Sequence, residues 1–385
     1  MRFWPFRPRP RYLISATPPE DLLALEDLLR RNVEDILVVR ERQLRGLSVV
    51  FGGELLVSPQ RALALLEMRF KPYGYTPFLR EEGGQVWVQA LPLAEVAAPA
   101  RVTWNVVLFL LTCLSTLLAG TGFAGSPTFD DFRRYAFPTW MLSGVPFAVT
   151  LLGILGVHEF GHYFTARYYK ASVSLPYFIP APPPLFLAGT LGAIIQMRSP
   201  ARDRNSLFDI AVAGPLAGLA VAVLAILLGL AWSAVVPAPP RGPVIEFGTS
   251  LLMRALMYLR FGQIPEGMMV FTHPIADAAW FGFLVTALNL FPVGQLDGGR
   301  IAYALFGRRH RAVGIATFVA LLALGVVTRS MNWIVWAGLL FFLIGFHHSP
   351  PLNDVTPLST GRRVVGVACL VLLVLLIPPV PIDIR

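Results

Sequence analysis

The stretch 155-LGVHEFGHYF-164 places two histidines four residues apart, with a glutamate between them, inside a long apolar segment. Residues four apart lie on one face of a helix, so His158 and His162 can hold one metal ion between their imidazoles. Glu159 lies beside that ion and can accept a proton from a water molecule there. Ionisable side chains at membrane depth are costly and usually functional. The stretch therefore predicts a metal centre inside a membrane-spanning helix.

The composition is that of a membrane protein. Of the 385 residues, 55% are hydrophobic and only 14% are charged, which leaves too little polar surface to cover a soluble domain. A helix needs about 20 apolar residues to cross a bilayer. We predict a polytopic α-helical membrane protein with about seven transmembrane helices, at residues 103–121, 141–165, 207–232, 275–293, 312–328, 331–347 and 364–380.

A third metal ligand is predicted in the stretch 286-TALNLFPVGQLDGGR-300. Pro292 and Gly294 break the fourth predicted span just before Asp297, and a carboxylate at such a break can reach a metal on a neighbouring helix. The alternative is that Asp297 only caps a helix. Asn289, two helical turns earlier, offers an amide to a developing oxyanion or to the substrate backbone.

The segment SLPYFIPAPPPLFLAGTLGAIIQM, at 174–197, is apolar but carries five prolines. It cannot form one straight helix, and irregular backbone at membrane depth requires surrounding protein or a water-filled cavity. We therefore predict a re-entrant segment beside a polar cavity. In the third span, Gly214 and Gly218 provide a small-residue face, which predicts close helix packing.

Residues 1–100 lack long apolar runs and carry most of the acidic residues. A capping-box pattern at 17–20 predicts a helix ending near Asn32, and Ser58-Pro59 opens a second helix. The stretch YTPFLREEGGQVWVQALP, at 75–92, predicts two strands joined by a glycine pair. We expect a small N-terminal α+β extramembrane domain at 1–100, with an accessory role and a linker at 92–100.

The predicted loops on the two sides of the membrane differ in their number of basic residues. Eleven lysines and arginines fall on the side of the N-terminal domain and six on the other, and cytoplasmic loops carry the excess. The N-terminus and both motifs are therefore predicted on the cytoplasmic side. The N-terminus lacks the apolar region of a secretory signal and is poor in serine, which favours a bacterial cytoplasmic membrane. The net charge of +9 is attributed to contact with anionic lipids of the bilayer, not to nucleic acid.

HEFGH in one span and NLFPVGQLDGG in a later one resemble the two signature motifs of the site-2 protease family of intramembrane zinc metalloproteases. The stretch GTLGAIIQMRSPARDRNSLFDIAVAGPLAG, at 189–218, is similar to the cyanobacterial and plastid branch known as ethylene-dependent gravitropism-deficient and yellow-green (EGY-like) proteins. The resemblance is strong over about 140–310 and implies a transmembrane zinc metalloprotease domain at 101–385. No segment resembles the PDZ domains of many relatives.

The resemblance implies a role for each motif residue. Glu159 would be the catalytic base, Asn289 would assist at the substrate, and Zn²⁺ would be bound by His158, His162 and Asp297. The re-entrant segment with Gly189 and Gly192 would pair with a substrate unwound into a strand. The implied reaction is hydrolysis of peptide bonds within or near transmembrane segments of other membrane proteins, as in regulated intramembrane proteolysis. Substrate identity and oligomeric state stay open.

Two rival functions have sequence signatures. A prenyl-protein-type zinc protease takes its last ligand from a glutamate on a later helix, but Glu246 and Glu266 both fall in the predicted loop 233–274. A zinc-bearing chaperone or transporter would not need Glu159, which is intact. The remaining titratable candidates are expected to serve in packing or loops: His273, His310, His347, His348, Cys113 and Cys369.

Overall fold

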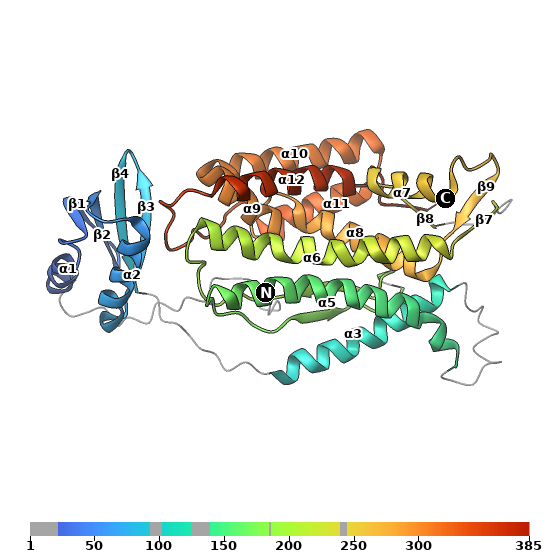
Figure 1. Ribbon diagram of the computed structural model, residues 1–385, viewed down its shortest axis with the longest axis horizontal. Coiled ribbons are helices and arrows are strands. Elements are labelled where there is room, and N and C mark those ends of the chain that lie inside the picture. The colour runs from blue at the N-terminus through green and yellow to red at the C-terminus, as the bar shows by residue number, and fades with distance from the viewer. Residues whose placement is uncertain (1–21, 93–101, 125–138, 185, 239–244, 385) are drawn as a thin grey trace.

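The computed structural model describes residues 22–92, 102–124, 139–184, 186–238 and 245–384. These residues form a bundle of long helices with a small mixed unit beyond one end (Figure 1). The predicted capping box at 17–20, and residues 93–100 of the predicted linker, lie outside the described residues.

Residues 22–92 form a four-stranded antiparallel sheet in the order β1-β2-β4-β3, with two helices. The helices are α1 (Leu22–Arg31) and α2 (Pro59–Phe70), with a 3₁₀ turn η1 (Lys71–Tyr73); the strands are β1 (Leu37–Arg45), β2 (Ser48–Leu55), β3 (Thr76–Glu82) and β4 (Gln85–Leu91). The two predicted helices and the β3–β4 hairpin are confirmed, whereas β1 and β2 were not predicted. Fully buried Leu29, Phe51 and Leu66 fill the space between sheet and helices.

Each predicted span contains a helix of the bundle. The helices are α3 (Val102–Phe123), α5 (Val145–Tyr168, preceded by the 3₁₀ turn η2, Thr139–Gly144), α6 (Arg204–Ala231), α8 (Pro274–Leu290), α9 (Asp297–Phe306), η3 (Gly307–Arg309), α10 (His310–Thr328), α11 (Met331–Leu339), the π-helical η4 (Leu340–Ile344) and α12 (Thr360–Leu376). Among the described residues, four helical stretches are long and apolar enough to cross a membrane, at Val102–Phe123, Trp140–Tyr168, Arg204–Ala231 and Asp297–Thr328. The total of about seven spans stays a prediction.

The bundle core lies where α5, α6 and α8 pack on one another. Phe147, Ile154, Phe208 and Phe283 are all buried there. Burial of such side chains contributes about 1.5–3 kcal/mol each in water, but a bundle in lipid relies more on close contact of small residues. Gly161 supplies that contact, because a Cβ there would meet the Ala213 carbonyl at 2.8 Å.

The proline-rich segment forms a two-stranded antiparallel hairpin, β5 (Tyr177–Pro180) with β6 (Thr190–Ile194). The prediction that it is not one helix is confirmed. The hairpin packs on α3 through β5 and on α5 through β6. The buried Asn105 amide of α3 fixes it by donating to the carbonyls of Leu175 and Pro176, at 3.1 and 2.8 Å. This donation gives the irregular backbone the partners that it needs in an apolar setting.

The two ends of the bundle carry different structures (Figure 1). The N-terminal unit lies at the end where α5 and α8 finish and α6 and α12 begin. The opposite end carries α7 (Leu251–Phe261) and two small antiparallel sheets, β7 (Ala234–Pro237) with β9 (Met268–Phe271) and β8 (Ile245–Phe247) with β10 (Ile382–Ile384).

The segment before α12 joins the N-terminal unit to the bundle. The N–H of Leu79, on edge strand β3, donates to the Leu352 carbonyl at 2.7 Å, and the Asp354 N–H donates back to Leu79 at 2.9 Å. On its other side, the Leu352 N–H donates to the Ala201 carbonyl at 3.0 Å. Leu352 also packs into the core of the N-terminal unit. The segment 352–354 therefore acts as a strand shared by both parts.

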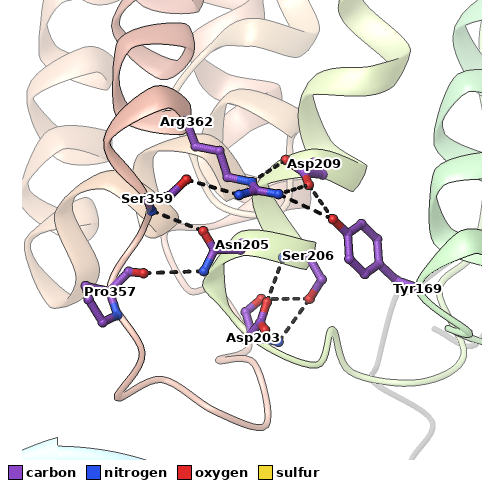
Figure 2. Close-up of polar contacts among 8 residues, drawn as sticks. All are labelled: Tyr169, Asp203, Asn205, Ser206, Asp209, Pro357, Ser359 and Arg362. Carbon is purple, nitrogen blue, oxygen red and sulfur yellow. Dashed lines mark hydrogen bonds and ion pairs between the residues drawn. The ribbon is translucent and has the colours of Figure 1, made fainter. Parts of the chain in front are cut away.

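A polar network ties three helices together near the same end (Figure 2). Arg362 of α12 makes a forked contact with Asp209 of α6, with N–O distances of 2.7 and 2.6 Å. The hydroxyl of Tyr169, just after α5, donates to the same carboxylate at 2.5 Å. Asp203 and Ser206 close a capping box at the start of α6. The network fixes where α5 ends relative to α6 and α12.

Candidate metal centre

The two histidines of the first motif lie on one buried face of α5, near its C-terminal end. His158 and His162 are each only 3% exposed, and Glu159 is 5% exposed. The Nε2 atoms of the two imidazoles lie 3.2 Å apart. The helical spacing of the motif thus brings the two nitrogens together as predicted.

Asp297 reaches the same point from another helix. Its Oδ2 lies 3.1 Å from His162 Nε2 and 3.4 Å from His158 Nε2. The alternative reading of Asp297 as a helix cap is wrong, because Leu296 holds the N-cap position of α9 and no side-chain cap bond forms. The carboxylate is directed at the histidines instead.

The break between α8 and α9 makes this approach possible. α8 ends at Leu290, before Pro292, and Gly294 turns the chain with φ +52°. Gly298 then lies directly against the Leu290 carbonyl, where a Cβ would not fit. The glycines of the second motif therefore allow α9 to begin close beside the end of α8, which places Asp297 next to α5.

The donor set fits a tetrahedral metal ion. Ligands at about 2.0–2.1 Å from a tetrahedral ion lie about 3.3 Å from one another, and the three separations here are 3.1, 3.2 and 3.4 Å. The Nδ1–H of His162 donates to the Ile210 carbonyl of α6 at 2.6 Å, which leaves its Nε2 as an acceptor. Lone pairs of nitrogen and carboxylate oxygen thus converge on one buried point, and a cation there relieves their repulsion.

The glycines of α6 make room for the two imidazoles. A Cβ on Gly214 would overlap the His162 ring, and one on Gly218 would come 3.0 Å from His158 Cβ. The prediction that these glycines serve close packing is confirmed. Their partners are the very side chains that form the metal centre.

Three further groups surround the centre. Glu159 Oε1 lies 3.9 Å from His158 Nε2, and its carboxylate accepts a hydrogen bond from the Ile195 backbone, just after β6. Asn289 Nδ2 lies 3.4 Å from His158 Nε2, so α8 does bring the predicted amide to the site. Arg300 lies one turn after Asp297, with its Nη1 3.8 Å from Asp297 Oδ1.

The two predicted substrate-contacting glycines differ in their surroundings. Gly189 has φ +72° and lies against the Ser115 backbone of α3, so packing alone accounts for it. Gly192 has φ +96°, and no heavy atom lies within 4 Å of the place where its Cβ would stand. Space for a side chain therefore lies beside Gly192, which is itself buried, but not beside Gly189.

The groups that sequence reasoning missed act through backbone or through local spacing. Nothing in the sequence marks the Ile210 carbonyl or the Ile195 amide as partners of the site. Arg300 did carry a signal, since a cation three residues after a carboxylate lies on the same helical face.

The remaining histidines lie away from the centre. His273 accepts from the Ile275 N–H at the start of α8, and His310 contacts the Gly307 carbonyl. His348 stacks on Tyr303. Glu246, one of the two carboxylates considered for the prenyl-protease reading, lies on β8 at the far end of the bundle. Among the described residues, only His158, His162 and Asp297 gather as a potential metal site.

The chain was compared with known proteins. Residues 146–328 match the model described as peptidase family M50. The chain is 35% identical over 266 residues to the probable zinc metalloprotease EGY2, chloroplastic, of Oryza sativa subsp. indica, covering 66% of this chain and 46% of that protein. It is 35% identical over 242 residues to the probable zinc metalloprotease EGY1, chloroplastic, of Arabidopsis thaliana, covering 61% and 43%.

A longer match covers most of this chain. The probable zinc metalloprotease EGY1, chloroplastic, of Oryza sativa subsp. japonica is 31% identical over 374 residues, covering 87% of this chain and 63% of that protein. The chain spans about half the length of the first two curated relatives. No solved structure matches it significantly.

Proposed function

Because residues 146–328 match the model of peptidase family M50, we propose that this chain is a zinc-dependent intramembrane endopeptidase of the site-2 protease type. It hydrolyses peptide bonds within or near transmembrane segments of other membrane proteins. The observation that carries the proposal is the convergence of His158, His162 and Asp297 on one buried point, with a carboxylate that is not a ligand, Glu159, 3.9 Å from His158.

The chain's own residues supply the steps of hydrolysis. Zinc held by the three ligands would polarise the scissile carbonyl and acidify a water molecule. Glu159 accepts the proton of the attacking water on its carboxylate and later delivers it to the leaving amine. Asn289, 3.4 Å from His158, donates its amide N–H to the oxygen on which negative charge develops. Arg300 orients Asp297 from the side away from the histidines.

The hairpin presents the substrate. A peptide bond in a helix is hydrogen-bonded internally and poorly accessible, so a substrate must unwind locally before cleavage. Strand β6 leads directly to Ile195, whose backbone contacts Glu159. Addition of the unwound segment to this strand would place a bond beside the base. We place the closest approach of the incoming chain at Gly192, where there is space for a further side chain.

The location of the chain follows from the charge distribution. We place residues 1–100 as an accessory domain on the cytoplasmic side of a bacterial cell membrane, with residues 101–385 as the protease domain. The excess of basic residues at the end of the bundle that faces the N-terminal unit supports this orientation. The names of the relatives assign those proteins to chloroplasts.

Two variants test the proposed function together. Glu159→Gln keeps the side-chain shape and all three ligands, so it should retain zinc while cleavage falls by about 10²- to 10⁴-fold. Asp297→Ala should lose both zinc and cleavage. Metal content of purified protein and cleavage of membrane proteins captured by the Glu159→Gln variant are the measurements.

Two outcomes would contradict the proposal. Full zinc and activity in Asp297→Ala would place the third ligand elsewhere. If captured partners are never cleaved by the wild-type protein, a zinc-bearing chaperone replaces the protease as the better description.

A further inference from the structure

A groove lies between the N-terminal unit and the adjacent end of the bundle, with a volume of about 750 Å³. Its walls include Lys71 and Glu67 on one side, and Lys170, Arg198 and Arg202 on the other. We refer to this space, defined by those five residues, as the basic groove. None of the metal-centre residues lines it.

The groove carries an excess of positive charge. Four of its five charged lining residues are lysine or arginine and one is glutamate, which leaves a net charge of +3 when all are ionised. Glu67 lies 4.0 Å from Arg202, so it offsets only part of this charge. Burial raises the pKa of the Glu67 carboxyl, against the opposing effect of Arg202. Such a groove attracts negatively charged ligands.

Lys170 enters the groove from a strained backbone position. It follows the C-cap of α5 and has φ +57°, and the Ala171 N–H donates back to the Ala166 carbonyl at 2.9 Å. Helices often end in this geometry, and glycine fits it without steric cost. A lysine here therefore adds charge to the groove at some expense of local stability.

The hairpin connects the groove with the base. Its ladder continues beyond β5 and β6, because the Ser174 N–H donates to Gln196 at 3.0 Å and the Arg198 N–H donates to Ser172 at 2.7 Å. Ile195, at Glu159, and Arg198, at the groove, are three residues apart along this extended chain, which is about 10 Å. A peptide laid along it would pass Glu159 and enter the groove within a few residues.

We propose that the basic groove binds the extramembrane flank of the substrate and favours substrates with acidic residues a few positions from the cleaved bond. The inference rests on the proposed function, because only a protease has a cleaved bond to which the flank is tied. It adds a chemical class of substrate that the metal centre does not define.

The test measures peptide binding to the Glu159→Gln protein, and cleavage of captured membrane proteins by the wild-type protein is measured separately. Short fluorescent peptides rich in glutamate, glutamine or lysine are titrated into the full-length Glu159→Gln protein in uncharged detergent at low salt. The glutamate peptide should bind most tightly. Lys170→Gly should weaken its binding about two- to fivefold, and addition of Lys71→Gln should bring the loss to about five- to twentyfold.

Arg329→Gly is the matched control. Arg329 is the other non-glycine residue with positive φ among the described residues, at +53°, and it ends α10 away from the groove. Both glycine variants relieve the same backbone strain, so both should be at least as stable as their parent. Only Lys170→Gly should weaken binding.

Three results would overturn the inference. The glutamate and glutamine peptides could bind equally, or Lys170→Gly and Arg329→Gly could weaken binding alike. Alternatively, anionic lipid vesicles could compete away all groove-dependent binding while the glutamate peptide has no affinity, which would assign the groove to a lipid surface. If the protein binds the acidic peptide but cleaves no substrate, the proposed function is refuted and the groove proposal stands.

If the protein cleaves substrates without preference for an acidic flank, the groove proposal is refuted and the proposed function stands.

Discussion

His162 is held on three sides of its imidazole ring. Its Nδ1–H donates to the Ile210 carbonyl at 2.6 Å, its Nε2 faces Asp297 at 3.1 Å, and Gly214 of α6 lies against the ring. The carbonyl fixes the tautomer, and the glycine fixes how closely α6 approaches. The position of this one ligand therefore depends on a residue that cannot itself bind metal.

Gly214→Ala should weaken metal binding without removing a ligand. The added methyl group would overlap the His162 ring, so the imidazole must turn away from Asp297. Loss of such a support typically lowers metal affinity by about 10- to 100-fold. Zinc per chain, measured after equilibration with a graded chelator, checks this.

Gly156→Ala is the control for this substitution. Gly156 lies on α5 itself, and a Cβ there would have no neighbour within 4 Å. It should leave zinc unchanged and stabilise the helix by up to about 1 kcal/mol. Equal zinc affinity in the two variants would show that α6 can shift to accept the methyl group.

Sequence spacing predicted the ligand residues because each motif is local. His158 and His162 share a helical face because they are four residues apart, and Pro292 and Gly294 predict the break in the helix before Asp297. The Ile210 carbonyl and the Ile195 amide could not be predicted, since every residue carries these groups and only the tertiary fold selects one. The contact of the α6 glycines with the α5 histidines could not be predicted either, because it depends on which helices pack together.

At the scale of elements, the contact of Arg362 with Asp209 joins α12 to α6. The two side chains are 34% and 25% exposed, and both carboxylate oxygens are engaged by the guanidinium. Tyr169 adds a third donor from the end of α5. This fork fixes the beginning of α12 beside the helices of the metal centre.

Arg362→Leu should destabilise the bundle by about 1–3 kcal/mol, because Asp209 keeps its charge but loses its forked partner. Thermal unfolding in detergent measures the loss. Arg363→Leu is the control, since the Arg363 guanidinium donates to the nearby Leu358 carbonyl at 3.0 Å and not to a carboxylate. The double replacement of Arg362 and Asp209 by leucine should cost less than Arg362→Leu alone. Additive losses would show that the pair is not coupled.

Elements with strong local signals were predicted, and those that depend on distant partners were not. The prolines of 174–197 excluded a helix but did not specify a hairpin, whose position is set by Asn105 on α3. Strands β1 and β2 were not predicted because β1 carries four charged or amide side chains in a row, from Arg40 to Gln43, and β2 contains Gly52 and Gly53. Gly53 is required there because it lies against the Val38 carbonyl.

At the scale of the whole molecule, the bundle has two chemically different ends. The N-terminal unit lies at one end, and α7 with the two small sheets lies at the other (Figure 1). The basic groove and the Arg362 network belong to the first end. If the first end is cytoplasmic, Arg61 on α2 and Glu266, between α7 and β9, lie on opposite sides of the membrane. Both residues are exposed.

Cysteine labelling checks this orientation. In a background with Cys113 and Cys369 replaced by alanine, Glu266→Cys should react with a membrane-impermeant maleimide in intact cells. Arg61→Cys should react only after lysis. If both cysteines react from the same side, the predicted topology is wrong, and the cytoplasmic assignment is wrong with it. Zinc content of each variant verifies that the fold is kept.

The shared strand at 352–354 has a consequence for biosynthesis. Leu79 leaves the ribosome roughly 270 residues before its partner Leu352, an interval on the order of 15 to 50 seconds at usual elongation rates. During that time the edge of β3 is a free strand edge, open to wrong partners. Its native partner is translated only after every helix of the described residues except α12. Attachment of the N-terminal unit is therefore a late assembly step, which can occur only after the helices that precede α12 have been translated.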